Sequence, residues 1–303
     1  MLSIAFFRRV AFLTALFAYL QIALGGVVRV TASGLGCPDW PLCHGRPYPA
    51  ADVHSIIEYS HRTVGAITGL LLIATVVLAW AVFRHQRPLV AWLATASLVA
   101  IAAEGALGGV VVTNELAPWL VLVHLGLAMI ILGFLIATAV MSLPTTEGVR
   151  DHSFRRLALI AAAATYFLLL TGSTVVASSA DESCHAWPLC GNGLALDFAG
   201  ANAFTMLHRG AVLVIGVMLV YVLIGSLRQA SVRPVALVTL LVLGLQVAVG
   251  AAAALTNAAL FNGLHVAIAT LVWSGMLSIA LLTLPRTDRE RAMSRLAVEK
   301  RPA

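Results

Sequence analysis

The sequence predicts an all-α integral membrane protein in which eight transmembrane helices form two repeated four-helix bundles. Three observations lead to this fold class. The 303-residue chain is 60% hydrophobic and 11% charged, with a mean hydropathy of +0.96, so it carries more apolar surface than a water-soluble protein can bury. Its apolar residues fall into eight runs of about 20 residues, which is the length that crosses a bilayer. The two halves of the chain also align with each other.

The eight spans follow one another with short polar links. We expect them at residues 10–28, 54–83, 89–112, 120–143, 157–177, 203–227, 235–255 and 261–284, with boundaries good to a few residues. Arg8 and Arg9 precede the first run. A cleaved signal peptide is an alternative there, but the run is long for one and no small-residue cleavage site follows it. These spans divide the chain into an N-terminal bundle (1–145), a cytoplasmic linker (146–156), a C-terminal bundle (157–285) and a basic tail (286–303).

The basic residues predict the orientation of the chain. If the N-terminus is cytoplasmic, all but four of the 19 basic residues lie in cytoplasmic segments; the four are Arg29, Arg46, Arg62 and Arg209. The positive-inside rule then predicts a multi-pass protein of the cell membrane, with both termini in the cytoplasm and both cysteine-containing loops on the outer side. The net charge of +6 reflects these cytoplasmic clusters, so we expect contact with membrane lipid and none with nucleic acid.

The internal repeat is clearest around the cysteines. Segment 37–43 (CPDWPLC) aligns with segment 184–190 (CHAWPLC) at an offset of 147 residues, and the same offset carries His61 onto His208. His124 aligns with His265 at an offset of 141. Each half has four helices, so both halves enter the membrane from the same side. The repeat is therefore expected to be parallel rather than inverted.

Each cysteine pair, Cys37/Cys43 and Cys184/Cys190, encloses five residues on the oxidising side of the membrane, which favours a disulfide within each pair. Each disulfide would stiffen a lid over its bundle. The alternative is a redox-active pair that passes reducing equivalents.

Four repeated histidines, His61, His124, His208 and His265, lie near the outer ends of the second, fourth, sixth and eighth spans. Two imidazoles at one depth on facing helices of a bundle are the arrangement that binds a haem iron from both sides. A hydrogen-bonded packing role is the alternative for one such histidine, but two pairs in register argue against it. Zinc fits less well, because it takes four ligands and each bundle offers two.

Arg62 and Arg209 directly follow two of these histidines. They lie near the outer interface, where a guanidinium can pair with the propionates of a haem. The alternative is an interfacial anchor that reaches to water.

The two halves differ at one carboxylate. Glu58 aligns with Thr205, so only the first half has an acid one helical turn from its histidine. Arg29 similarly aligns with Val176. An acid beside the iron suits chemistry, so we assign the first bundle to a substrate haem, with Glu58 catalytic, and the second to a cofactor haem. The structural alternative for Glu58 is a salt bridge to Arg62.

A second intramembrane acid, Glu104, lies on the third span at a position that aligns near Gln246. We expect Glu104 to hydrogen-bond to a neighbouring helix rather than to take part in chemistry.

Segment 25–45 (GGVVRVTASGLGCPDWPLCHG), followed by segment 57–62 (IEYSHR), resembles the haem A synthases. The resemblance covers the whole chain, including the eight spans, the duplicated histidines and both cysteine loops. Ala32 is a small departure, at a position where glycine is usual. The resemblance implies oxidation of the C8 methyl of haem O to a formyl group by successive hydroxylations through a hydroxymethyl intermediate. The product is haem A for terminal oxidases.

The resemblance also implies roles for individual residues. His61 and His124 would flank the substrate haem, with Glu58 as the essential acid. His208 and His265 would hold a haem b cofactor.

Two rival functions are a dihaem cytochrome b for electron transfer and a haem carrier for oxidase assembly. Neither requires an acid beside one histidine only, so Glu58 discriminates between them and the synthase. Haem O is the expected substrate. Haem O synthase and terminal oxidase assembly factors are candidate partners, and a homo-oligomer stays open.

Overall fold

The computed structural model describes residues 3–190 and 196–287. This part of the chain folds into eight long helices and one short 3-10 turn, with no β-strand element. They are α1 (Ile4–Val30), α2 (Val53–Phe83), α3 (Pro88–Thr113), α4 (Pro118–Met141), α5 (His152–Ala177), η1 (Ala180–Glu182), α6 (Asn202–Leu227), α7 (Arg233–Thr256) and α8 (Ala259–Thr283). All eight α-helices are long and apolar enough to cross a membrane. The predicted all-helical multi-pass membrane fold is confirmed.

Two helices begin earlier than their apolar runs. α1 begins at Ile4 and α5 at His152, whereas the apolar runs begin at residues 10 and 157. Each has an N-cap whose side chain accepts a backbone N–H: Ser3 for α1, and Asp151 for α5. Caps of this kind stabilise a charged first turn that hydropathy alone leaves out. The predicted linker is therefore shorter than 146–156, because its end belongs to α5.

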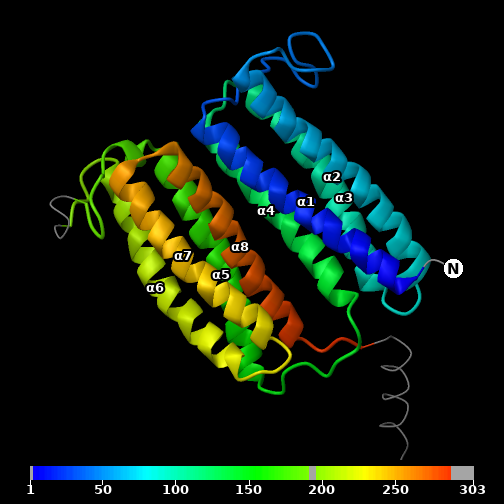
Figure 1. Ribbon diagram of the computed structural model, residues 1–303. Helices are drawn as coiled ribbons and strands as arrows, with labels where there is room; N and C mark the ends of the chain where they lie inside the picture. Colours follow the sequence, from blue (N-terminus) through cyan, green and yellow to red (C-terminus); the bar gives the residue numbers. More distant parts are fainter. Residues whose placement is uncertain (1–2, 191–195, 288–303) are drawn as a thin grey trace, which may run out of the picture.

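The eight helices form two groups of four (Figure 1). In the first group, contacts run from α1 to α2, α3, α4 and back to α1; in the second, they run from α5 to α6, α7, α8 and back to α5. The groups meet through contacts of α1 with α8 and of α4 with both α5 and α8. Both cysteine loops lie at the end of the molecule opposite to the start of α1. This arrangement is compatible with a parallel repeat, which stays a prediction.

Aromatic side chains and α4 glycines bring the two groups together. Trp273 on α8 packs against α4, where a Cβ at Gly133 would lie 3.0 Å from its ring, and its Nε1–H donates to the Ala162 carbonyl at 3.2 Å. Tyr166 on α5 donates its hydroxyl to the Gly126 carbonyl at 3.1 Å. A buried aromatic ring contributes a large apolar area while its polar atom is satisfied. These contacts hold the groups in one body and leave the space near the cysteine loops open.

The linker between the groups pairs with the start of the tail. Thr146 and Arg286 exchange two backbone hydrogen bonds of 2.8 Å, so the end of α8 is tied to the chain that leaves α4. The rest of the predicted basic tail, from residue 288 onward, lies outside the described residues.

Candidate functional site

One cavity of about 1990 Å³ runs through both groups of helices at the end near the cysteine loops. All four repeated histidines line it. Pockets for single small ligands span about 300–1,000 Å³, so this cavity has room for more than one. Its walls are largely apolar, as befits a large hydrophobic ligand.

Each histidine ring lies against a glycine of the preceding helix. A Cβ at Gly25, Gly108, Gly172 or Gly250 would lie 3.2, 3.4, 3.1 or 2.7 Å from the Cε1 atom of His61, His124, His208 or His265, respectively. Small residues let a neighbouring group approach the helix backbone closely. The four glycines therefore make the space in which the four imidazoles lie.

Each ring also has a polar partner on that same preceding helix. The closest pairs are Gln21 Nε2 with His61 Nε2 (3.2 Å), Glu104 Oε1 with His124 Nδ1 (3.0 Å), Thr171 Oγ1 with His208 Nδ1 (2.8 Å) and Gln246 Nε2 with His265 Nδ1 (3.0 Å). A second group that contacts a ligating histidine orients its ring. Sequence reasoning expected a partner on a neighbouring helix for Glu104 but did not identify the histidine, and it missed the other three pairs. The signal was a polar residue four positions before a glycine, as in Gln21/Gly25, Glu104/Gly108 and Gln246/Gly250.

Several buried polar atoms at the first histidine pair lack a hydrogen bond within the described residues. They include the Nδ1 atoms of His61 and His124 and the Oε2 atom of Glu104. Glu104 Oε1 lies 3.0 Å from His124 Nδ1, yet this nitrogen makes no hydrogen bond with the described residues, so the contact is a close approach rather than a formed hydrogen bond. Unpaired buried polar atoms are costly, and a bound group that draws on both imidazoles would relieve that cost.

These residues fit a haem better than a bare metal ion. Each group of four helices presents two imidazoles to the cavity, which is the ligand number that a porphyrin iron needs along its axis. Among the described residues, no three His, Cys, Asp or Glu side chains come together in a way that would hold an ion.

Arg62 binds the first cysteine loop. Its Nη1 donates to the carbonyls of Asp39 (2.7 Å) and Leu42 (2.6 Å), and its Nη2 donates to the Cys37 carbonyl (2.8 Å) and to Glu58 Oε1 (2.5 Å). A guanidinium has four Nη hydrogens and one Nε hydrogen. All four Nη hydrogens are therefore engaged with the protein itself.

Glu58 is held by the same loop. It is 3% exposed; its Oε1 accepts from Arg62, and its Oε2 accepts the Cys37 backbone N–H at 2.8 Å. The salt bridge expected as the structural alternative is thus present. Glu58 also lines the cavity, and its catalytic role stays a prediction.

The second half holds its cysteine loop without an acid. Arg209 Nη1 donates to the carbonyls of Ala186 (2.8 Å) and Pro188 (3.2 Å). Thr205, which aligns with Glu58, is buried and makes a long hydrogen bond of 3.4 Å to the Ala180 carbonyl. The carboxylate that distinguishes the halves in sequence therefore distinguishes their loop contacts as well.

Both predicted disulfides, Cys37–Cys43 and Cys184–Cys190, are formed. The first loop also forms part of the cavity wall, since a Cβ at Gly109 on α3 would lie 3.1 Å from the Trp40 ring and Trp40 lines the cavity. Whether either pair changes redox state during function stays open.

Most of this chain is similar to known proteins. Residues 8–277 match the model of the COX15-CtaA family, described as cytochrome oxidase assembly protein. A protein named "Heme A synthase" from Shouchella clausii (strain KSM-K16) is 27% identical over 291 residues, which cover 91% of this chain and 96% of the relative. Proteins of the same name from Bacillus cereus (strain G9842) and Bacillus anthracis (strain CDC 684 / NRRL 3495) are each 27% identical over 267 residues, covering 84% of this chain and 86% of theirs.

Proposed function

This chain belongs to the COX15-CtaA family of cytochrome oxidase assembly proteins, and we propose that it is a haem A synthase that converts haem O into haem A. One structural observation supports the proposal. Two histidine pairs line a single large cavity, and among the described helices that carry these histidines and their partners, only those of the first half contain carboxylates, Glu58 on α2 and Glu104 on α3. The acid that the second half places at the cavity, Glu182, lies in its cysteine loop. Two porphyrin sites of unequal chemistry are what an enzyme needs if one haem is changed and the other is kept.

We place the substrate in the N-terminal bundle (1–145) and the cofactor in the C-terminal bundle (157–285). His61 and His124 bind the iron of haem O, and His208 and His265 bind that of a haem b cofactor. When bound, haem b supplies one-electron transfer. The glycine opposite each imidazole keeps that ring at the cavity wall, and the polar partner on the same helix orients it.

Glu58 is the proposed catalytic acid. Each hydroxylation by dioxygen consumes two electrons and two protons, because one oxygen atom enters the C–H bond and the other leaves as water, and a positioned carboxylate can deliver such protons. The two donors on Glu58 hold its oxygens in place at the cavity wall. Arg62 through Nε, and Arg209 through the donors that its loop leaves free, are the proposed partners of haem propionates.

We further propose that the protein lies in the cell membrane with both termini in the cytoplasm and both cysteine loops outside. The two disulfides suit an oxidising compartment. Haem O synthase and terminal oxidase assembly factors are the proposed partners, because haem O and haem A are too hydrophobic to diffuse freely through water.

Pigment analysis tests the function. The chain is expressed with a haem O synthase in a host that makes no haem A, and the extracted haems are identified by mass. Haem A together with a hydroxylated intermediate is expected; haem O and protohaem alone would refute the proposal. Glu58→Ala should still bind haem but make no haem A. His208→Ala or His265→Ala should lose haem b, and its retention would reverse the assignment of the two bundles.

A further inference from the structure

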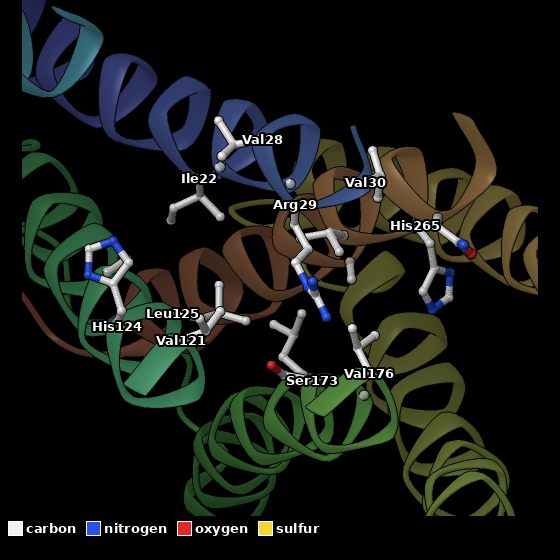
Figure 2. A pocket seen from close by; sticks show the side chains of 18 of the residues that line it. Ile22, Val28, Arg29, Val30, Val121, His124, Leu125, Ser173, Val176 and His265 are labelled. Carbon is white, nitrogen blue, oxygen red and sulfur yellow. The ribbon is translucent and has the colours of Figure 1, made fainter. Parts of the chain in front are cut away.

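One cation of the cavity belongs to neither histidine pair. Arg29 is the penultimate residue of α1. Figure 2 shows its side chain extending from α1 into the space between His124 and His265, towards Ser173 and Val176 of α5. A residue of the first bundle thus points at a helix of the second, in the part of the cavity that the two share.

The Arg29 guanidinium has no hydrogen bond or ion pair with any described residue, although the side chain is exposed to the cavity. Three acidic residues of the described chain line this cavity: Glu58, Glu104 and Glu182. Glu58 Oε1 accepts from Arg62 and its Oε2 accepts the Cys37 backbone N–H, and Glu104 faces His124. Arg29 is exposed within the cavity, so its donors can be reached by a negatively charged ligand that binds there.

Arg62, the other cation near the first histidine pair, cannot bind a carboxylate through two parallel hydrogen bonds from its Nη atoms. All four Nη hydrogens of Arg62 are bound to the cysteine loop and to Glu58. Arg29 offers the same fork of donors with none engaged. At the aligned position in the second half, Val176 has no polar group, so among the residues that the structure describes Arg29 is the one cation at the junction of the bundles.

We propose that Arg29 is a carboxylate-binding residue at the junction of the two bundles and that its ligand is a propionate of a bound haem. The proposal rests on the proposed function, because the haem brings the negative charge. A guanidinium binds a carboxylate through two parallel hydrogen bonds, which fixes direction as well as adding affinity. Since Arg29 lies between the two histidine pairs, it fixes how one porphyrin is rotated about its iron axis.

A binding cycle tests the proposal. The full chain in detergent is titrated with iron protoporphyrin IX and with its dimethyl ester, in which both propionates are blocked. Hydrogen bonds to charged groups contribute about 1.5–3 kcal/mol, and each 1.4 kcal/mol is a factor of ten, so blocking the propionates should weaken wild-type binding about 10- to 150-fold. Arg29→Leu should lose a similar factor for the free acid and almost nothing for the ester. Such non-additivity is the mark of direct contact.

A graded substitution and a control variant complete the binding cycle. Arg29→Lys keeps the charge but not the fork, and should fall between Arg29 and Arg29→Leu. Arg46→Leu removes a cation that lies over the Tyr48 ring in the same loop region and outside the cavity, so it should leave both affinities unchanged. If Arg29→Leu does not fold, the comparison of acid and ester on wild type and Arg29→Lys still decides.

Two backgrounds identify which haem supplies the carboxylate. The first, His208→Ala with His265→Ala, leaves the substrate pair; the second, His61→Ala with His124→Ala, leaves the cofactor pair. The background in which Arg29→Leu weakens binding identifies the ligand. Equal loss on esterification with and without Arg29, in both backgrounds, would overturn the role of Arg29 alone. Absence of haem binding by the wild type would overturn the proposed function, and this role with it.

Discussion

Replacing Glu58 with alanine should destabilise the contact between α2 and the first cysteine loop. The change removes the acceptor of two buried donors, the Cys37 backbone N–H at 2.8 Å and Arg62 Nη2 at 2.5 Å. A hydrogen bond to a charged acceptor contributes about 1.5–3 kcal/mol. Counting only the bond to Cys37, the loop should open about 10- to 150-fold more often, because each 1.4 kcal/mol is a factor of ten.

Amide hydrogen exchange followed by mass spectrometry measures this opening. The protein is labelled with its disulfide intact and reduced after quenching, so that the peptide over residues 36–43 can be read. Thr205→Ala is the matched control, because Thr205 occupies the aligned position in the second half and does not touch this loop. Exchange in Glu58→Ala within about twofold of wild type would refute the view that Glu58 holds the loop.

Three further perturbations test other parts of the site. Gly250→Ala on α7 places a Cβ 2.7 Å from the imidazole of His265 and should lower haem content, whereas Gly210→Ala on α6, which has nothing within 4 Å and does not line the cavity, should not; equal haem content in both would count against the role of the glycines. Glu104→Gln should change the electron paramagnetic resonance of the haem in the first bundle only, and an unchanged spectrum would remove its ring-orienting role. The pKa of the Asp39 carboxyl is held below its ordinary value of 3.8, mainly because the Gly45 N–H donates to it. A depressed carboxyl pKa stabilises the fold above the unfolded value, and this contribution is lost as pH falls through the folded value. The protection of this loop, taken relative to the intrinsic exchange rate at each pH, should therefore fall as pH drops through the folded pKa of Asp39, which lies below 3.8, and Asp39→Asn should abolish that dependence.

The eight spans could be predicted because the transfer of a side chain into lipid is a local property that adds up along the chain. The starts of α1 and α5 could not be predicted in this way. There, Ser3 and Asp151 satisfy the first backbone N–H groups, and the charged first turns lie outside the apolar run. Capping is visible in sequence, but hydropathy does not weigh it.

The four histidines could be singled out because the repeat places them at matching positions, whereas their surroundings could not. The contact of Gly25 with His61 depends on the rotation of α1 against α2, which no spacing within one helix reveals. The pairing of Glu58 with Arg62 follows from the i, i+4 spacing and was open as an alternative. The further hydrogen bonds of Arg62 depend on the path of the loop backbone, which a C-x5-C spacing does not define.

The hydrogen bonds between α2 and the first cysteine loop determine what it costs to open this loop. Glu58 and Arg62 lie one turn apart and bind the loop through one backbone N–H and three carbonyls, so lifting this loop would break these four hydrogen bonds together. A large ligand that entered the cavity by displacing this loop would have to break all four at once.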